Sequence, residues 1–252
     1  MSKEQYLIFL SDIYTKRDGS HLSYASVDKY GNQATKKVDQ YLHRLMPQYE
    51  TMFDISSYSE LLKLKQALLS DKEFIEEDNT GNRMFSAGFN RYLEFASGQL
   101  LINKEKSLHL LDKKEEVKYS GVMLHEDVRL IRDRIKILQV EKACNYTCQI
   151  DPTHETFIAE ASNMPYLEGH HIIPLNQQDD FDYSLDCYAN IIALCPTCHR
   201  FFHYGLKTQR EEKLIKLYEN RAERLSNSGI VIDRKEFLER TYSGIMQTIK
   251  YE

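Results

Sequence analysis

Two cysteines and two histidines fall within nine residues in the last quarter of the chain, and this cluster restricts the fold more than any other feature. Cys195 and Cys198 form a C-x2-C pair, His199 follows directly, and His203 comes four residues later. Pro196 suits the first turn of a helix that would start at this pair. On that helix His199 and His203 lie one turn apart on the same face, where both imidazoles can bind one metal ion.

Two short apolar runs precede this helix and are predicted as strands. The first occupies residues 168–175 and contains the adjacent pair His170 and His171, and the second occupies residues 190–194. Neighbouring side chains of an extended strand point to opposite faces. We therefore expect one of the two histidines to face a metal ion and the other to face a substrate phosphate.

The histidine pair on the helix does not match the metalloprotease signature. That signature is H-E-x-x-H, in which a glutamate between the ligands acts as the base. Here Arg200, Phe201 and Phe202 stand between His199 and His203, so no glutamate is present. An H-x3-H pair by itself is also an ordinary surface or core feature, and its interpretation depends on the motifs around it.

The cysteine count favours metal binding over disulfides. The chain has five cysteines, of which four form two close pairs, Cys144 with Cys148 and Cys195 with Cys198. An odd number in tight pairs is typical of metal sites in chains of the reducing cytosol. The fifth, Cys187, is most simply a small buried apolar residue.

Composition points to a cytoplasmic protein with two modules. A chain of 252 residues with 42% hydrophobic residues is long enough for a sizeable core and lies near the boundary between one and two domains. It has no apolar run of membrane-spanning length, and its start lacks the basic region and cleavage site of a secretion signal. We expect neither a membrane span nor secretion.

The net charge of −5 is not typical of a nucleic-acid-binding protein, so any contact with DNA must be local. Residues 128–142 carry five basic side chains against two acidic ones. This stretch could contact DNA, although a solvated helix face explains it equally well.

The first hundred residues are predicted to be mainly helical. Leucines between positions 61 and 69 recur at helical spacing after a capping-box pattern at residues 57–60. A second run, at residues 84–95, is closed by Gly98, a residue that commonly ends helices. Its aromatic side chains are interpreted as core. This part of the chain contains no chemistry that we can identify.

A charged, aperiodic segment at residues 99–121 is interpreted as a solvated connector between two domains. A helix is then expected through residues 128–140, and it leads to Cys144. After His203 a helical stripe covers residues 214–225, Gly229 breaks it, and a last short helix follows near residues 235–245.

Taken together, the motifs resemble the HNH, or ββα-metal, endonuclease family, and in particular the HNH modules of bacterial restriction-type endonucleases. The resemblance covers about residues 143–205. The residues that carry it are His170-His171-Ile172-Ile173-Pro174, Leu185-Asp186, Asn190, the stretch 194–199, and His203-Tyr204-Gly205.

The resemblance implies a role for each histidine. His170 would be the first ligand of a divalent metal ion, His199 and His203 further ligands, and His171 the general base. Asn190 would hold the loop between the two strands with its amide and so fix the direction of the base. The chemistry is consistent, because imidazole titrates near neutral pH and can deprotonate water. Magnesium, manganese, nickel and zinc are all candidates for the catalytic ion.

A second, structural zinc ion is also expected. Thiolates of Cys148, Cys195 and Cys198 would hold it and connect the strands to the helix. The fourth ligand is either His154 or Cys144. Resemblance favours His154, because related modules carry a similar Cys, Asp and His followed by Thr-Phe.

The expected fold is α+β and predominantly helical. A helical domain at residues 1–118, which would recognise the target, is followed at residues 119–252 by a ββα-metal nuclease domain with flanking helices and the structural zinc site.

The expected function is metal-dependent hydrolysis of phosphodiester bonds in double-stranded DNA. The resemblance implies a role in restriction or anti-phage defence, with dependence on DNA modification as one form of it. We expect DNA contacts from Arg129, Arg132, Lys136 and Arg200. A homodimer would place two sites on opposite strands. The alternatives are a homing, mobile-element or repair nuclease, a non-catalytic zinc module that binds DNA or protein, and a structural protein with a hydrogen-bonded histidine cluster.

Overall fold

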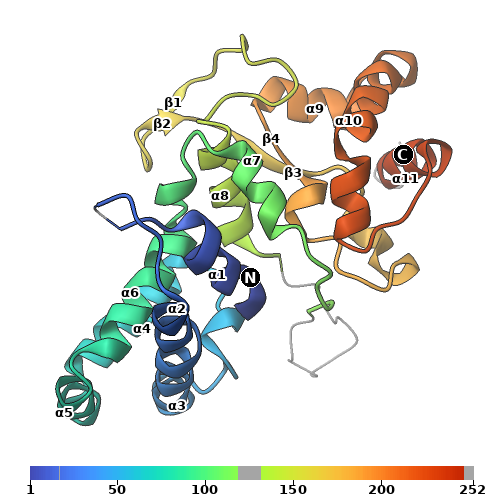
Figure 1. Ribbon diagram of the computed structural model, residues 1–252. Coiled ribbons are helices and arrows are strands. Elements are labelled where there is room, and N and C mark those ends of the chain that lie inside the picture. The colour runs from blue at the N-terminus through green and yellow to red at the C-terminus, as the bar shows by residue number, and fades with distance from the viewer. Residues whose placement is uncertain (17, 119–131, 247–252) are drawn as a thin grey trace. The chain divides into compact units, whose positions relative to one another are not determined.

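The computed structural model describes residues 1–16, 18–118 and 132–246. The described chain is predominantly helical, with two short antiparallel strand pairs (Figure 1). It divides into two compact units. The first comprises residues 1–101 together with 133–135, and the second comprises the other described residues from Ile102 on.

The first unit is built from helices around an aromatic core. Tyr6 and Phe9 of the N-terminal segment pack against Tyr92 and Phe95, and the rings of Tyr6 and Tyr92 meet edge to face with their centroids 5.2 Å apart. Such edge contacts add about 0.5–1.5 kcal/mol to the effect of burial alone. The aromatic residues near position 90 are therefore core, as predicted. The helices are α1 (Lys3–Ile8), α2 (Tyr24–Asp28), α3 (Thr35–Leu45), α4 (Tyr58–Ser70), α5 (Lys72–Thr80) and α6 (Met84–Ser97).

Two predicted helix ends can be compared with the structure. Helix α6 ends at Ser97, and Gly98 follows it in the left-handed region with φ +66°, as the sequence indicated. Helix α4 begins at the predicted place, but the predicted capping box does not form. The hydroxyl of Ser57 lies 2.8 Å from that of Ser59, and Glu60 accepts a hydrogen bond from Tyr49 instead. The side chains of Ser57 and Glu60 are thus bonded to other side chains and not to each other's backbone N–H.

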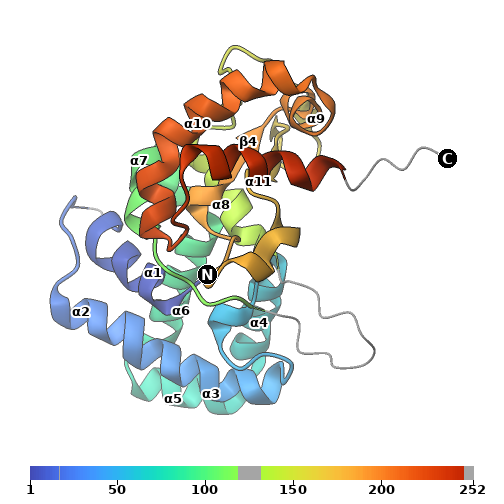
Figure 2. The same cartoon turned by 90° about the vertical axis from the view of Figure 1, so that its right-hand side faces the viewer.

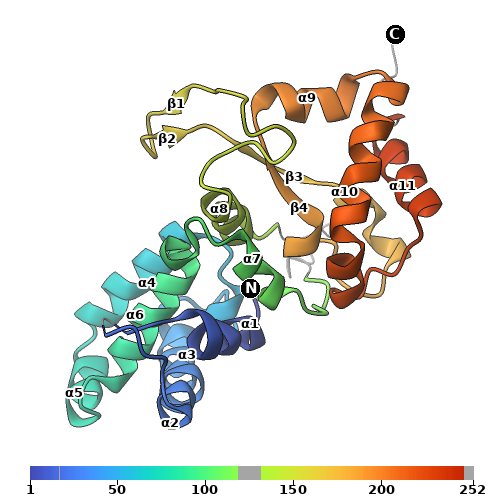
Figure 3. The same ribbon diagram turned by 45° about the horizontal axis from the view of Figure 1, so that its top comes forward.

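The second unit contains both strand pairs and the longest helix. The strands are β1 (Ile158–Ala159) with β2 (Met164–Pro165) and β3 (Glu168–His171) with β4 (Ile191–Leu194), each pair antiparallel. Figure 3 shows β3 and β4 side by side, with α9 following β4. The helices are α7 (Glu105–Leu108), α8 (Arg134–Ala143, within this unit from residue 136), α9 (Pro196–Tyr204), α10 (Lys207–Asn227) and α11 (Arg234–Met246).

The C-terminal helices follow the predicted pattern. Leu214, Leu217 and Leu225 form the buried stripe of α10, which packs against α11 (Figure 2). Gly229 separates the two helices with φ +84°, and a Cβ at this position would lie 2.3 Å from the Tyr183 ring. The glycine is therefore required both by its backbone conformation and by close packing.

Part of the segment predicted as a solvated connector is packed into the second unit. Leu108 and Leu111 are buried, and the carboxylate of Asp112 accepts hydrogen bonds of 2.6 and 3.1 Å from the guanidinium of Arg224. The prediction of a solvated connector is wrong for these residues. Charge density alone does not reveal whether a charged side chain faces water or a buried partner.

Of the helix expected at residues 128–140, the part before Arg132 lies outside the described residues. Helix α8 begins at Arg134, so Arg132 and Asp133 are not helical, contrary to expectation, and it ends directly before Cys144, as expected. None of the helices in the described part of the chain combines the length and the apolar character that crossing a membrane requires.

Candidate functional site

A strand pair and the helix that follows it position the site. In the β3–β4 register, His170 lies opposite Ile192 and His171 opposite Ile191. All four residues of β4 are fully buried, so this strand anchors the pair in the core. At Gly169 a Cβ would lie 2.4 Å from the side chain of Ile137, so glycine allows β3 to lie close to α8.

Helix α9 starts directly after β4. Pro196 occupies its first turn, and the sulfur of Cys195 accepts a hydrogen bond from the backbone N–H of Cys198, 3.4 Å away. The proline and the N-terminal cap are consistent with the predicted start of this helix. His199 and His203 then lie one turn apart.

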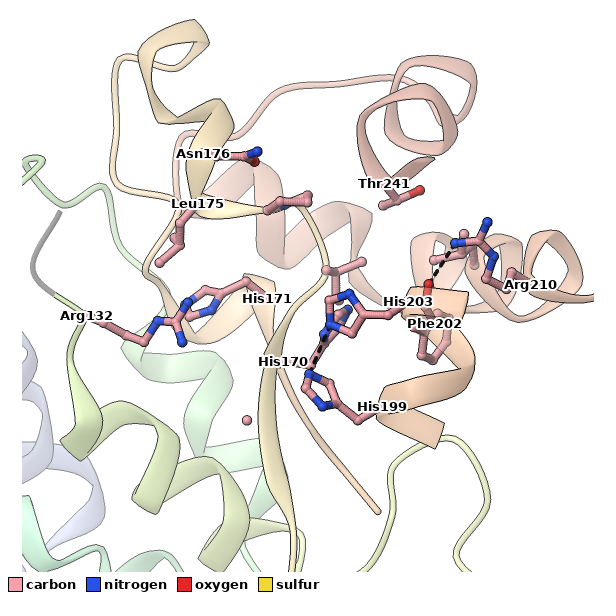
Figure 4. A pocket seen from close by; sticks show the side chains of 14 residues that line it. Arg132, His170, His171, Leu175, Asn176, His199, Phe202, His203, Arg210 and Thr241 are labelled. Carbon is pink, nitrogen blue, oxygen red and sulfur yellow. Dashed lines mark hydrogen bonds between the residues drawn. The ribbon is translucent and has the colours of Figure 1, made fainter. Parts of the chain in front are cut away.

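Three imidazoles converge between β3 and α9. The ring centroids of His199 and His203 are 4.7 Å apart, and each lies 5.1 Å from the centroid of His170. Nε2 of His203 is 3.2 Å from Nε2 of His199 (Figure 4). One nitrogen from each ring lies within 4.8 Å of the others, so the set could hold a metal ion. The structure thus brings together the three predicted ligands.

Burial favours the uncharged, metal-binding form of two of these imidazoles, His170 and His203. Burial, with the neighbouring rings of His199 and His203, lowers the pKa of His170 to about 3. Burial also lowers the pKa of His203. At neutral pH both rings are therefore uncharged and retain a lone pair, as metal ligation requires.

Glu168 supports one of the three histidines. Its Oε2 is in ion-pair contact with Nδ1 of His199, on the side of the ring opposite the Nε2 that approaches His203. Carboxylates at this position commonly orient metal-binding histidines. The sequence analysis assigned Glu168 no role. Its place two residues before His170, and hence on the same face of β3, was the available signal.

His171 has a different environment from its neighbour His170. Its side chain is buried, and its Nε2 lies 2.7 Å from Oδ1 of Asp186. Because a carboxylate accepts, Nε2 carries the proton and Nδ1 is left with the lone pair. Asp186 belongs to the Leu185-Asp186 motif, but the sequence analysis gave it no role either.

All four histidines line one pocket. Its volume is about 380 Å³, and Arg132 and Arg210 also line it (Figure 4). Within the described part of the chain, no carboxylate is among the lining residues. The pocket therefore combines imidazoles with guanidinium groups, a surface suited to an anion.

Asn190 holds two segments that lie next to His171 and Asp186 in the sequence. Its Oδ1 accepts from the backbone N–H of Ile173 at 2.8 Å, and its Nδ2 donates to the carbonyls of Ile173 and Leu185, both at 2.9 Å. The residue is fully buried. One segment follows His171 and the other precedes Asp186, so Asn190 connects the backbone next to these two residues.

A second cluster consists of three thiols and one imidazole. One ligand atom each from Cys148, His154, Cys195 and Cys198 lies within 4.8 Å of the others. Nδ1 of His154 is 3.2 Å from the sulfur of Cys198 and 3.6 Å from that of Cys195. Three sulfurs and one imidazole are a common donor set for tetrahedral zinc.

The alternative fourth ligand lies outside this cluster. The thiol of Cys144 is buried and donates to the backbone carbonyl of Glu141 at 3.2 Å. Of the two candidates, the structure therefore places His154, and not Cys144, with the other three ligands. His154 in turn has its Nε2 3.4 Å from the carboxylate of Asp151.

The basic residues expected to contact DNA differ in their exposure. Arg132 is exposed and lines the histidine pocket, and Arg200 is exposed on α9 with its guanidinium 5.9 Å from the centroid of the Tyr204 ring. The prediction that Lys136 contacts DNA is wrong, because Lys136 is only 3% exposed and its ammonium is bound to the Glu115 carboxylate at 2.8 and 2.9 Å. Arg129 lies outside the described residues.

Two strands and a helix that share a histidine cluster define the ββα-metal class of nuclease sites. Residues 144–204 match the family model described as HNH endonuclease. This part of the chain is therefore an HNH endonuclease domain.

The chain is also similar to a particular restriction enzyme. Over 60 residues it is 37% identical to the Type IV methyl-directed restriction enzyme EcoKMcrA of Escherichia coli strain K12. The matched stretch is 24% of this chain and 20% of that enzyme, so the chain matches about a fifth of its relative's length. No solved structure matches the chain significantly.

Proposed function

We propose that the protein is a metal-dependent endonuclease of the restriction type that hydrolyses phosphodiester bonds in double-stranded DNA. The observation that carries this proposal is the single pocket lined by His171 and by the three-histidine cluster. A base and a metal-binding set that open onto one cavity can act on the same phosphate.

His171 is the general base of this proposal. With Nε2–H committed to Asp186, the lone pair on Nδ1 is the position that takes a proton from the attacking water. Asn190 joins the segment after the base to the segment before Asp186, because its Nδ2 donates to a backbone carbonyl of each. The exposed guanidinium of Arg132 is placed to bind a substrate phosphate at the same pocket.

His170, His199 and His203 would hold the catalytic ion. When bound, a divalent ion supplies Lewis-acid stabilisation of the charge that develops on the phosphate and on the departing 3′ oxygen. A donor set of nitrogens favours manganese, nickel or zinc over magnesium by intrinsic affinity, and cellular supply decides among them.

Cys148, His154, Cys195 and Cys198 would hold a structural zinc ion. Cys195 also caps the N-terminus of α9, the helix that carries His199 and His203. The thiol cluster therefore fixes the start of the catalytic helix, while Cys148 and His154 tie the segment before β3 to it. In a domain with only short strands, such a cross-link contributes directly to folding.

The biological role we propose is defence against foreign DNA, with cleavage dependent on DNA modification. The support is the similarity of a 60-residue stretch of the chain to a methyl-directed restriction enzyme. In this proposal the helical unit at residues 1–101 recognises the target, and a homodimer cuts both strands because each chain contributes its HNH site. The net charge of −5 requires that DNA contacts be confined to local basic residues such as Arg132 and Arg200.

The proposal is tested with the purified chain on matched DNA substrates. Plain, methylated, hydroxymethylated and phosphorothioated plasmids are incubated with the protein in the presence of magnesium, manganese, nickel or zinc. Each incubation is repeated with a chelator. We expect cleavage that needs a divalent metal and that is faster on a modified substrate. Metal-dependent cutting at equal rates on all four substrates would reject modification dependence, and binding of DNA without cutting under every condition would favour a non-catalytic zinc module.

A further inference from the structure

A buried ion pair lies behind the base and its carboxylate. The ammonium of Lys136 on α8 is 2.8 and 2.9 Å from the two carboxylate oxygens of Glu115, and the two side chains are 4% and 9% exposed. Lys136 and Glu115 are 21 residues apart in the sequence, and Glu115 comes from the segment that was expected to be a solvated connector.

The ion pair is bonded to the backbone around Asp186. Nζ of Lys136 also donates to the backbone carbonyl of Asp186 at 2.5 Å. The backbone carbonyl of Glu115 accepts from the N–H of Ser184 at 2.9 Å, and the Ser184 hydroxyl accepts from the N–H of Asp186 at 3.2 Å. The two charged residues thus hold this segment at two points two residues apart.

Asp186 transmits this constraint to His171. Its carboxylate is the hydrogen-bond partner of the His171 Nε2 at 2.7 Å, and both side chains are buried. A displacement of the Asp186 backbone would therefore turn or shift the imidazole. Burying two charges is costly, and apolar residues of similar volume often stabilise a fold as well or better. In this pair, Nζ of Lys136 and the backbone carbonyl of Glu115 are bonded to the segment that carries Asp186.

We propose that Lys136 and Glu115 are positioning residues for the general base, acting through Asp186. The proposal rests on the proposed function, because it assumes that His171 is the base. Misplacing a catalytic group by about 1 Å costs on the order of 100-fold in rate. Loss of the ion pair should therefore slow the chemical step and leave DNA affinity unchanged.

The main test removes both charges together. Replacing only one partner leaves an unpaired buried charge, which can prevent folding, so the double variant Glu115→Leu/Lys136→Met is used. Its matched control is Glu212→Leu/Lys216→Met, which removes an ion pair of 2.8 Å that is exposed on α10. Glu115→Gln is a milder second variant, because it retains the shape of the side chain and an amide oxygen that can accept a hydrogen bond from Lys136.

Three quantities are measured for each variant: the single-turnover cleavage rate at saturating DNA, the Kd for DNA, and the downfield proton resonance of His171 Nε2–H. That resonance is assigned by its absence in His171→Ala. We expect the double variant to cut about 10–100-fold more slowly than wild type with unchanged Kd and a shifted or broadened resonance. We expect Glu115→Gln to show smaller changes in the same direction and the control to match wild type.

A folded double variant with the wild-type rate and an unshifted resonance would overturn the proposal. If the double variant does not fold, Glu115→Gln decides in the same way. Failure of the proposed function is a separate result: wild type would then not cut DNA, while the His171 resonance would still report whether the ion pair orients the ring.

Discussion

Nε2 of His171 and Oδ1 of Asp186 are 2.7 Å apart in the interior of the HNH domain, and this contact assigns the two nitrogens of the imidazole different tasks. Nε2 keeps its proton for the carboxylate, and Nδ1 is free to accept one. The neighbouring ring of His170 instead joins the cluster of His199 and His203. In the proposed mechanism, these two adjacent histidines therefore serve as the base and as a metal ligand.

Replacing Asp186 tests this division. We predict that Asp186→Ala retains the fold and the structural zinc but cuts DNA about 10–100-fold more slowly, because the imidazole loses the partner that fixes its tautomer and orientation. The measurement is the rate of plasmid nicking at saturating protein, with zinc content determined in parallel. A variant with unchanged nicking would show that the Asp186 carboxylate does not serve the base.

Replacing single cysteines tests the composition of the thiol cluster. Cys148→Ser is expected to lose the structural zinc and to have a lower Tm, because a hydroxyl is a poor substitute for a thiolate ligand. Cys144→Ser is the matched control, since its thiol is also buried but bonds to a backbone carbonyl. Zinc per chain is measured after purification. Loss of zinc from the Cys144 variant, with zinc retained in the Cys148 variant, would contradict the assignment.

The ion pair between Asp112 and Arg224 provides a test of how the second unit is held together. Both side chains are buried and share two hydrogen bonds. Breaking such a pair typically costs about 3–5 kcal/mol, so Asp112→Asn should markedly lower the free energy of unfolding. The matched control is Glu212→Gln, which removes the exposed ion pair with Lys216 and should change the free energy of unfolding by less than about 1 kcal/mol. Unfolding in urea measures both, and equal effects would show that residues near 112 are not integrated into the unit.

Glu141 gives a prediction for the pH dependence of stability. Burial raises the pKa of this carboxyl from its ordinary 4.5 to about 7. The unfolded chain therefore releases this proton at lower pH than the folded chain, and the contribution of Glu141 becomes destabilising as pH rises from about 4.5 to about 7. Glu141→Gln should have little effect on Tm at about pH 4.5 and raise it relative to wild type at about pH 8. Thermal unfolding of both proteins at the two pH values measures this, and an equal difference at both values would contradict the assignment.

The local part of the site could be predicted from the sequence. Helix geometry alone places His199 and His203 on one face of α9. The start of this helix at Pro196 is indicated by the proline itself and by Cys195 directly before it. The same holds for the end of α6 at Gly98. Each of these features depends on residues within a turn or two of one another.

The supporting contacts could not be predicted because they join distant segments. Asp186 meets His171 across 15 residues, and Lys136 reaches the Asp186 carbonyl across 50. In the sequence, Lys136 is one of several cations and Glu115 one of several acids in a charged stretch. Only the fold shows that these two are buried and paired, while Arg132 is exposed.

Strand scission by His171→Ala tests the central claim most directly. Nicking of supercoiled plasmid is followed for wild type, His171→Ala and the control His21→Ala, whose ring is exposed in the first unit, each with excess metal and with chelator. We predict that wild type and the control cut only with metal, whereas His171→Ala stays folded, binds DNA and retains its structural zinc but does not cut. If folded His171→Ala nicked the plasmid at the wild-type rate, the assignment of the base and the mechanism built on it would be contradicted.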